Sequence, residues 1–442
     1  MNQPKTTRIE HEIFAELAML CVKPGYVHVI AYFCFRDNII TYDGKMTEAD
    51  MQQMFDPSRL IRTEITTLTG LMVKAKIDWQ IPHPDILQSY IDKSERLLSE
   101  LHDCMIASSF RYTPGEEQTN QSRNPFNAGT AMREPIFYGS ESAYIFQYYD
   151  LAARKYCADA SWLLENYGFT IDDACTVMRA VERLQEDRVV ESRQRLAKLH
   201  PDDWTMLPCF TFTASEIAAH ACLSSELTKR ILAAFTLPVA DRNEMFGALQ
   251  DFNAVSATPL LHMPDGQFLL LQSYALAEAL YEAPFYWMMR DKNYQKILAE
   301  NRGYFTESFV AERLSLVFGR DRVFINVNVW ESKARKVGEI DVLVIWGDRA
   351  IVVQAKSKRL TLEARKGNDL CIRDDFKKSI QDSYDQGVLC AQSLGDKHRV
   401  LITAKGCNVT LPNDLHEIYL FCVVSDHYPA RFDNDGSYYQ RN

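Results

Sequence analysis

No run of apolar residues in this chain approaches the roughly 20 that a helix needs to cross a bilayer. The eleven cysteines are odd in number and scattered, and no two form a C-x-x-C pair, so a structural zinc site is not expected. The opening residues, MNQPKTTRIE, carry no secretory signature. We therefore expect a reducing, cytoplasmic setting and no membrane partner.

Glycine motifs that bind phosphate are also missing. Neither a Walker A sequence nor G-x-G-x-x-G occurs, which leaves a nucleotide-driven motor without support. The composition is otherwise ordinary for a globular protein, with 47% hydrophobic and 24% charged residues among 442. At roughly 100–200 residues per domain, this length predicts two to four domains.

Charge is distributed unevenly along the chain. The formal net charge is −10, which argues against a protein coated in basic residues. Residues 301–400, however, hold 18 Lys and Arg against 14 Asp and Glu, a local net charge of +4. A basic groove in this region is therefore compatible with the net negative charge of the whole chain.

Residues 1–110 are predicted to form an α+β region. Residues 8–22 have a helical pattern. Residues 26–35 and 39–42 flank a polar Arg-Asp-Asn turn and predict a β-hairpin. Further helical patterns follow before residue 110.

Residues 111–135 are polar and rich in glycine, proline and asparagine, so they predict a long loop. Residues 136–205 are expected to be helical.

Residues 206–292 outline a winged helix. Two short helices are predicted within 213–236, and Pro264-Asp265-Gly266 is a strong hairpin turn. Such a unit either reads DNA or serves as a packing module, and its second helix offers only Lys229 and Arg230 as basic groups.

Residues 293–428 change character and predict an α/β domain with a mixed central sheet flanked by helices. The expected elements, in order, are a helix at 295–318, strands at 322–330, 338–346 and 350–357, a helix at 372–394, and strands at 399–403 and 417–424. The first three strands must form an antiparallel meander, because their links are too short for crossovers. The strand after the later helix is expected to pair in parallel, and residues 429–442 are expected to be a frayed tail.

Charged and amide side chains interrupt two of these otherwise apolar strands. Glu339 and Asp341 lie two apart on one strand, so they are expected to share a face. Gln354 and Lys356 have the same relation on its neighbour. Buried charges are costly unless they have each other, water or a metal ion as partners.

This arrangement suits phosphodiester hydrolysis assisted by a hard cation. The oxygen ligands would be the Asp341 carboxylate, the Gln354 side-chain carbonyl and the Ala355 backbone carbonyl. A cation activates a water and offsets charge on the phosphate. Lys356 would hold that water and stabilise developing negative charge, and Glu307 on the preceding helix is placed to reach the same site.

At these residues the sequence resembles the PD-(D/E)xK nuclease superfamily, and within it the Mrr-type restriction endonucleases and the nuclease-related (NERD) domains. The similarity spans about residues 295–425, with GEIDVLVIWGDRAIVVQAK as its core. It implies a restriction-endonuclease-like fold, a Mg²⁺ or Mn²⁺ cofactor and, in most members, a DNA substrate.

The resemblance assigns roles residue by residue. Asp341 matches the family's metal-binding aspartate, Lys356 its catalytic lysine, and Glu307 the acidic residue of its first helix. Gln354 departs from the pattern, since most members have Glu or Asp there. An amide is a weaker metal ligand than a carboxylate, so this departure bears on metal affinity more than on fold.

Two alternatives stay open at this stage. A glutamine of the later helix often supports the site in this branch of the family, and Gln381 fits, with Gln386 as the other candidate. The second alternative concerns catalysis itself: Asp341 and Lys356 would form only a cross-strand salt bridge, in a sheet that has no catalytic role.

Basic residues concentrate beside the motif. Residues 333–366 hold nine basic and four acidic groups. Phosphate binding needs such a patch, although charge alone would serve solubility equally well. The predicted nucleic-acid-binding residues are Lys333, Arg335, Lys336, Lys358, Arg359, Arg365 and Lys366.

The sequence thus predicts a metal-dependent nuclease that acts on DNA, most simply double-stranded DNA. The N-terminal region would recognise a target, a protein partner or a second copy of the chain. A role in defence against foreign DNA follows only by analogy with related nucleases. The alternative is a catalytically inactive nuclease fold that binds nucleic acid.

Overall fold

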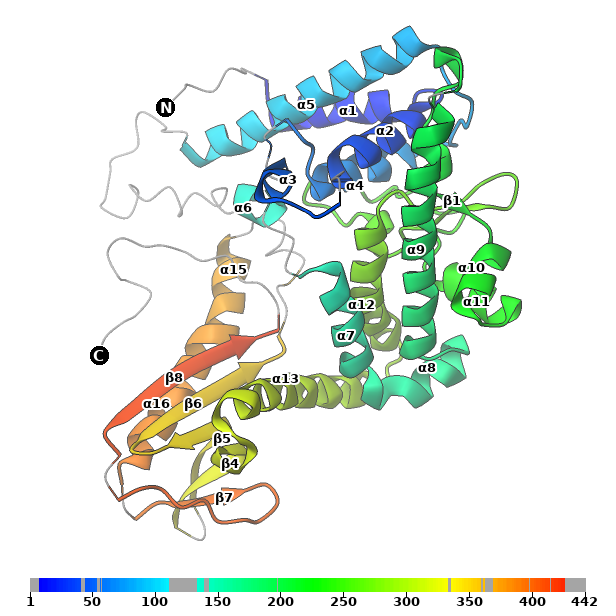
Figure 1. The fold of residues 1–442 in the computed structure, drawn as a ribbon. Helices are drawn as coiled ribbons and strands as arrows, with labels where there is room; N and C mark the ends of the chain where they lie inside the picture. The colour runs from blue at the N-terminus through cyan, green and yellow to red at the C-terminus, as the bar shows by residue number, and fades with distance from the viewer. Residues whose placement is uncertain are drawn as a thin grey trace. The chain divides into compact units, whose positions relative to one another are not determined.

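The computed structural model describes residues 8–40, 44–53, 56, 58–110, 133–138, 143–196, 198–332, 335–358, 361, 369–396, 398–413 and 415–425. The chain divides into two compact units, Met1–Met288 and Met289–Asn442, which are described separately (Figure 1). Helices accompany a three-stranded sheet in the first unit and a five-stranded sheet in the second. The predicted mixed α/β class is therefore confirmed.

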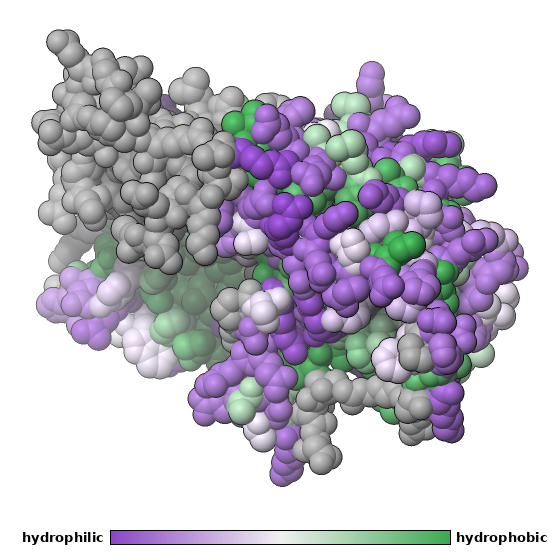
Figure 2. Space-filling model, turned by 90° about the horizontal axis from the view of Figure 1, so that it is seen from above, coloured by the Kyte–Doolittle hydropathy of each residue, from purple (hydrophilic) through white to green (hydrophobic). Residues whose placement is uncertain are grey.

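The first unit is mainly helical. Its helices are α1 (Glu10–Cys21), α2 (Tyr26–Asn38), α3 (Glu48–Gln52), α4 (Arg62–Met72), α5 (Pro84–Phe110), α6 (Arg133–Tyr138), α7 (Ile145–Lys155), α8 (Ala160–Tyr167), α9 (Ile171–Leu196), α10 (Ala214–Ala221), α11 (Ser225–Ala234) and α12 (Ser273–Met289). Leu17, Ile30 and Leu68 are fully buried in a core shared by α1, α2, α4 and α5. Among the residues that Figure 2 draws in colour, hydrophilic ones predominate on this face, and hydrophobic ones form smaller patches between them.

No single helix in the described part of the chain is long and apolar enough to cross a membrane. Helices α1 and α2 reach that length only together, and they are bent by 106°.

The β-hairpin predicted over residues 26–42 is wrong. Residues Tyr26–Asn38 form helix α2, which packs against α4 and α5, and no strand occurs in the described part of residues 8–110. The segment is rich in aromatic and β-branched residues, which favour strands by propensity. Burial of nine of its thirteen residues overrides that preference, and Asp37, read as a turn residue, is buried against Arg36.

The remaining predictions for this unit concern residues 111–292. Most of the loop predicted at 111–135 lies outside the described residues, and α6 begins at Arg133, inside that range. The helices expected in 136–205 are confirmed as α7, α8 and α9.

The two helices and the hairpin expected in 206–292 are also confirmed. They are α10 and α11, then β2 (Leu261–His262) and β3 (Phe268–Leu269), and the hairpin joins β1 (Thr211–Phe212) in the order β1-β3-β2.

The second unit follows the predicted order of elements. They are α13 (Gln295–Phe318), β4 (Val323–Ser332), β5 (Arg335–Trp346), β6 (Arg349–Lys356), α15 (Asp369–Phe376), a π-helical turn (Lys377–Gln381), α16 (Asp382–Leu394), β7 (Val400–Thr403) and β8 (Glu417–Val424). The tail predicted at 429–442 lies outside the described residues.

The five-stranded sheet has the order β7-β4-β5-β6-β8. Strands β4, β5 and β6 form the predicted antiparallel meander. The expectation that the strand directly after the later helix pairs in parallel is wrong. Strand β7 lies at the far edge and pairs antiparallel with β4, and the parallel partner of β6 is the last strand, β8.

Helices α13 and α16 cover opposite faces of this sheet. Val342 and Val353 pack with Val310 of α13. Leu343 and Val352 pack with Leu394 of α16. Because neighbouring strand residues point to opposite faces, the two clusters lie on opposite sides of β5 and β6.

Strands β4 and β5 both change face at the same level. Residues three apart on a regular strand lie on opposite faces, yet Phe324 and Val327 share one cluster, as do Ile340 and Leu343. The pairing register is the same on both sides of this level, since Ile325 pairs with Val342 and Val327 with Ile340. Each strand therefore loses one step of alternation between these pairs, where Asn326 and Asp341 lie opposite each other.

We expect Gly25→Ala to lower the free energy of unfolding by more than Gly266→Ala does. Both glycines have a left-handed φ, 72° and 83°, where alanine costs about 1–2 kcal/mol. A Cβ at Gly25 would also lie 2.6 Å from the carbonyl oxygen of Gln80, adding roughly 1–3 kcal/mol, whereas a Cβ at Gly266 has no neighbour within 4 Å. Denaturant unfolding of both variants measures the difference. Equal losses would contradict this packing of the α1–α2 turn.

Candidate functional site

Asp341 lies where β5 and β6 part. Their paired residues run from Trp346 and Arg349 to Val342 and Val353. Just beyond the last pair, the Asp341 Oδ2 atom accepts a hydrogen bond of 2.7 Å from the backbone N–H of Ala355. In a strand the N–H and C=O of one residue point to the same neighbour, so we expect the Ala355 carbonyl to face this side as well.

The Glu339 carbonyl on β5 collects donors from two elements. The Nε2 groups of Gln354 on β6 and Gln386 on α16 donate to it at 2.8 and 3.2 Å. The thiol of Cys390 lies 3.5 Å from the same oxygen. These bonds fix the Gln354 amide, because only its nitrogen can donate. Its Oε1 atom is then buried with no hydrogen-bond partner, in a side chain that is 0% exposed.

Glu307 on α13 is brought into this neighbourhood. Burial raises the pKa of Glu307, and a side-chain hydrogen bond from Asn326 opposes that rise. The negative charges of Asp341 and Glu339 raise the pKa further, and Lys356 lowers it. The carboxylate of Glu307 thus interacts with groups on both β5 and β6.

Asp341 has the same electrostatic character. Burial raises its pKa, against the hydrogen bond from Ala355 and the attraction of Lys356. The charge of Glu339 raises it further. Glu307 and Asp341 thus both lie within electrostatic reach of Lys356, and the charge of Asp341 acts on Glu307. Two carboxylates there are held at a cost in an environment that disfavours their charge.

The residues at this point offer oxygen donors to a cation. They are the Glu307 and Asp341 carboxylates, which suit Mg²⁺ or Mn²⁺. The Gln354 side chain, with its unpartnered Oε1, bonds the Glu339 carbonyl beside Gln386 of α16, the helix on the face of the sheet opposite α13. No group of three His, Cys, Asp or Glu side chains close enough for a metal occurs in the described part of the chain. Amide and backbone carbonyl oxygens would thus have to complete the set.

Gln381 and Gln386 occupy different positions. Gln381 ends the π-helical turn, and its amide donates to Asp385 one turn further on. Gln386 donates to the Glu339 carbonyl, as described above. Gln386, the other candidate from the sequence, is therefore the glutamine that contacts a strand of the motif.

The described members of the predicted basic patch all have carboxylate partners. Arg335 pairs with Glu331 at 2.7 Å, and Lys336 with Glu339 at 2.6 Å. Lys358 pairs at 2.9 Å with the buried carboxylate of Asp375 on α15, which anchors the chain after β6. Any phosphate would compete with these carboxylates. The other predicted cations, Lys333, Arg359, Arg365 and Lys366, lie outside the described residues.

Two residues near the site were missed by sequence reasoning. Arg302 is buried on α13, and its guanidinium lies 3.5 Å from the carbonyl of Ser357, just after β6. Its i+4 spacing from the buried Leu298 was a usable signal for an inward position. Asn326 gave no such signal, because an isolated polar residue in a strand is ordinarily read as facing water.

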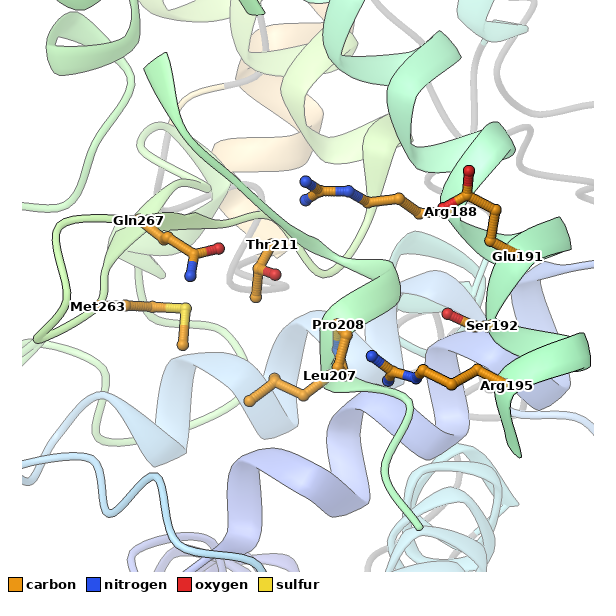
Figure 3. A pocket seen from close by; sticks show the side chains of 9 residues that line it. All are labelled: Arg188, Glu191, Ser192, Arg195, Leu207, Pro208, Thr211, Met263 and Gln267. Atoms are coloured by element: carbon orange, nitrogen blue, oxygen red, sulfur yellow. The ribbon is translucent and has the colours of Figure 1, made fainter. Parts of the chain in front are cut away.

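A separate pocket of about 500 Å³ lies in the first unit (Figure 3). Arg188 and Arg195 of α9 extend toward it from one side, and Gln267 faces it from the β2–β3 hairpin. Arg188 is already paired with Glu216 at 2.6 Å. This pocket contains none of the motif residues, so it is no part of the candidate site.

We expect Asp341→Asn to stabilise the metal-free protein by about 0.5–2 kcal/mol at neutral pH, because it removes a buried charge. A carboxyl with a raised folded-state pKa costs stability as pH rises through that pKa. The gain should therefore shrink on acidification and vanish below about pH 4, the ordinary pKa of aspartate. Thermal unfolding from pH 3.5 to 8 tests this. Asp348→Asn, an exposed control, should show no gain, and a pH-independent gain at Asp341 would contradict the charge argument.

A carboxylate at position 354 should not make the protein more stable. Gln354→Glu replaces the Nε2 donor by an oxygen that faces the Glu339 carbonyl, in a fully buried position. We expect a loss of about 1–3 kcal/mol in the free energy of unfolding at pH 7.5. Denaturant titration measures it, with exposed Gln392→Glu as the control. An unchanged midpoint would mean that the Gln354–Glu339 bond adds nothing to stability.

Comparisons with known proteins supply no relative for this chain. No protein-family model matches it, and no match was found among curated proteins or solved structures. The candidate site therefore rests on the residues and geometry of the chain itself.

Proposed function

We propose that the second unit is a metal-dependent nuclease of the PD-(D/E)xK type that hydrolyses phosphodiester bonds in DNA. The observation that carries the proposal is the position of Asp341 where β5 and β6 part, within electrostatic reach of Glu307 and Lys356. These are the three residues to which the sequence resemblance assigns the metal-binding and catalytic roles. They come from a helix and two strands, so their meeting depends on the fold.

Each side chain has a role in this proposal. Asp341, Glu307 and the side-chain carbonyl of Gln354 would hold the cation, and the Ala355 N–H fixes the orientation of the Asp341 carboxylate. A bound Mg²⁺ or Mn²⁺ supplies a Lewis acid that activates water. The Lys356 ammonium stabilises the negative charge that develops on the phosphate. Gln386 and Gln354 together hold the Glu339 carbonyl, which keeps β5 in place beside the site.

A second candidate function is nucleic-acid binding without catalysis. Its support is Gln354, an amide where most family members have a carboxylate, with an Oε1 atom enclosed at 0% exposure. An enclosed oxygen reaches a cation only if the site opens locally. On this view the same fold binds DNA without cleaving it, and the first unit recognises the target or a protein partner.

Cleavage of plasmid DNA in Mg²⁺ or Mn²⁺ distinguishes the two functions. We expect Lys356→Ala to reduce the rate by about 100-fold or more, because it removes the cation that stabilises the developing charge. The matched control is Lys296→Ala, a lysine on α13 whose side chain is 89% exposed. It should cleave at the wild-type rate.

The possible results of these assays distinguish the nuclease from the inactive nucleic-acid-binding protein. Equal rates for wild type and Lys356→Ala would show that a contaminant or another site cleaves the DNA. If no duplex, single strand or RNA is cleaved, but salt-dependent binding survives Asp341→Ala and chelation, the protein is the inactive binder. Parallel reactions on the three substrates also define the substrate class.

A further inference from the structure

The pocket between helix α9 and the β2–β3 hairpin has the volume of a small-molecule site (Figure 3). It measures about 500 Å³, and ligand pockets in proteins commonly range from about 300 to 1,000 Å³. Most of its lining side chains are polar or charged, whereas cavities left by imperfect packing are apolar. The pocket thus offers polar groups around a space for a ligand of about mononucleotide size.

Two arginines of α9 approach this pocket from one face of the helix. Arg188 and Arg195 are seven residues apart, which is nearly two full turns, so both side chains extend to the same side (Figure 3). Ser192 lies between them on that face and is 5% exposed. A charged helix face ordinarily meets open water, whereas this one lines a concave surface.

Hydrogen bonds between distant segments hold the walls of the pocket together. The Nη2 atom of Arg188 donates to Glu216 at 2.6 Å, and the other oxygen of Glu216 accepts from the Thr213 N–H at 2.7 Å, at the start of α10. The Nε2 atom of Gln185 donates to the Leu270 carbonyl at 2.7 Å and so ties α9 to the end of β3. A site fixed in this way loses little conformational entropy when a ligand binds.

The guanidinium of Arg195 is available to a ligand. In the part of the chain that the structure describes, Arg195 makes no ion pair and no hydrogen bond, and its side chain extends toward Pro208 (Figure 3). Arg188 uses one donor on Glu216 and retains others. Guanidinium groups bind phosphate oxygens through paired N–H donors. The two arginines together therefore suit a phosphate group.

The other lining groups suit the rest of a nucleotide. Glu191 is exposed one turn before Arg195, and a carboxylate is the usual acceptor for sugar hydroxyls. The Nε2 atom of Gln267 donates to Asp265 at 2.7 Å, which leaves its Oε1 atom as an acceptor for a base. Met263 adds an apolar surface on the hairpin side.

We propose that this pocket binds a ribonucleoside monophosphate, with its phosphate at Arg188 and Arg195 and its sugar hydroxyls at Glu191. The inference goes beyond the proposed nuclease function and does not depend on it, because the pocket contains none of the motif residues. Inorganic phosphate would leave most of the volume empty and would be repelled by Glu191. An extended nucleic-acid backbone would meet the same repulsion, whereas a small ester with hydroxyl groups uses both the cations and the carboxylate.

The test is calorimetric titration of the full chain with AMP, GMP, CMP and UMP in EDTA, which keeps metal ions away from the candidate cation site. We expect at least one of them to bind. Arg195→Ala should weaken the tightest by about 10-fold or more, because charged hydrogen bonds to the phosphate are lost. Arg195 has no partner to lose within the described structure, so this variant should unfold at the wild-type temperature. The matched control is Arg183→Ala, an exposed arginine of α9 outside the pocket, which should keep the wild-type affinity.

A second variant tests the place of the sugar. The wild type should bind the matching 2′-deoxynucleotide about 5-fold or more weakly, because Glu191 loses a hydroxyl donor. In Glu191→Gln the difference between the two sugars should shrink to less than about 2-fold. If Glu191→Gln instead binds the ribonucleotide more tightly than the wild type does, the carboxylate only repels the ligand, and its assignment to the sugar is wrong.

Four results would overturn the inference. No heat of binding from any of the four nucleotides at millimolar concentration rejects the pocket as a nucleotide site. Binding that survives Arg195→Ala unchanged places the ligand elsewhere. Inorganic phosphate that binds as tightly as the nucleotide reduces the site to an anion site. A single-stranded DNA 10-mer that binds through Arg195, when no mononucleotide binds, makes the occupant a nucleic acid. None of these results bears on plasmid cleavage, so the proposed nuclease stands or fails separately.

Discussion

The architecture of the second unit depends on how backbone groups are satisfied where β5 and β6 part. A buried N–H or C=O without a partner costs free energy, so a sheet that splays must supply substitutes for the lost ladder bonds. Here the substitutes are side chains: Asp341 accepts from the Ala355 N–H, and Gln354 donates to the Glu339 carbonyl. The residues with a chemical signature are thus also the residues that close the ladder. This double use holds them in fixed orientations before any ligand arrives, which is what preorganisation requires.

That arrangement has an electrostatic cost. Burial raises the pKa of both Glu307 and Asp341; the charge of Asp341 raises the pKa of Glu307 further, and the charge of Glu339 raises both. A protein selected for stability alone would place neutral groups there, whereas a site for a cation or a phosphate-bound metal benefits from concentrated negative charge. Lys356 offsets part of this charge from β6. Arg335, Lys336 and Lys358, the described members of the predicted basic patch, are already paired with carboxylates. The charge count of this patch therefore overstates what is free to meet phosphate.

Much of the C-terminal fold could be predicted from the sequence. The helix at 295–318 and the three strands of the meander begin and end within a few residues of the predicted positions, because amphipathic periodicity and short turns determine them locally. Helix α2 could not, since its residues favour strands by propensity and form a helix only because they are buried against α4 and α5. The pairing of β7 with β4 was equally out of reach, because the choice of sheet edge depends on how the whole chain packs.

For the candidate site, the sequence by itself determined which polar residues interrupt apolar strands and how far apart they lie. The tertiary structure decided which of them meet. Simple alternation would put Glu339 and Asp341 on one face, but both β4 and β5 lose a step of alternation at Asn326 and Asp341. It also decided that Gln386, rather than Gln381, reaches the Glu339 carbonyl. These contacts join segments dozens of residues apart, and only long-range packing sets their geometry, whereas periodicity is a property of neighbours in the chain.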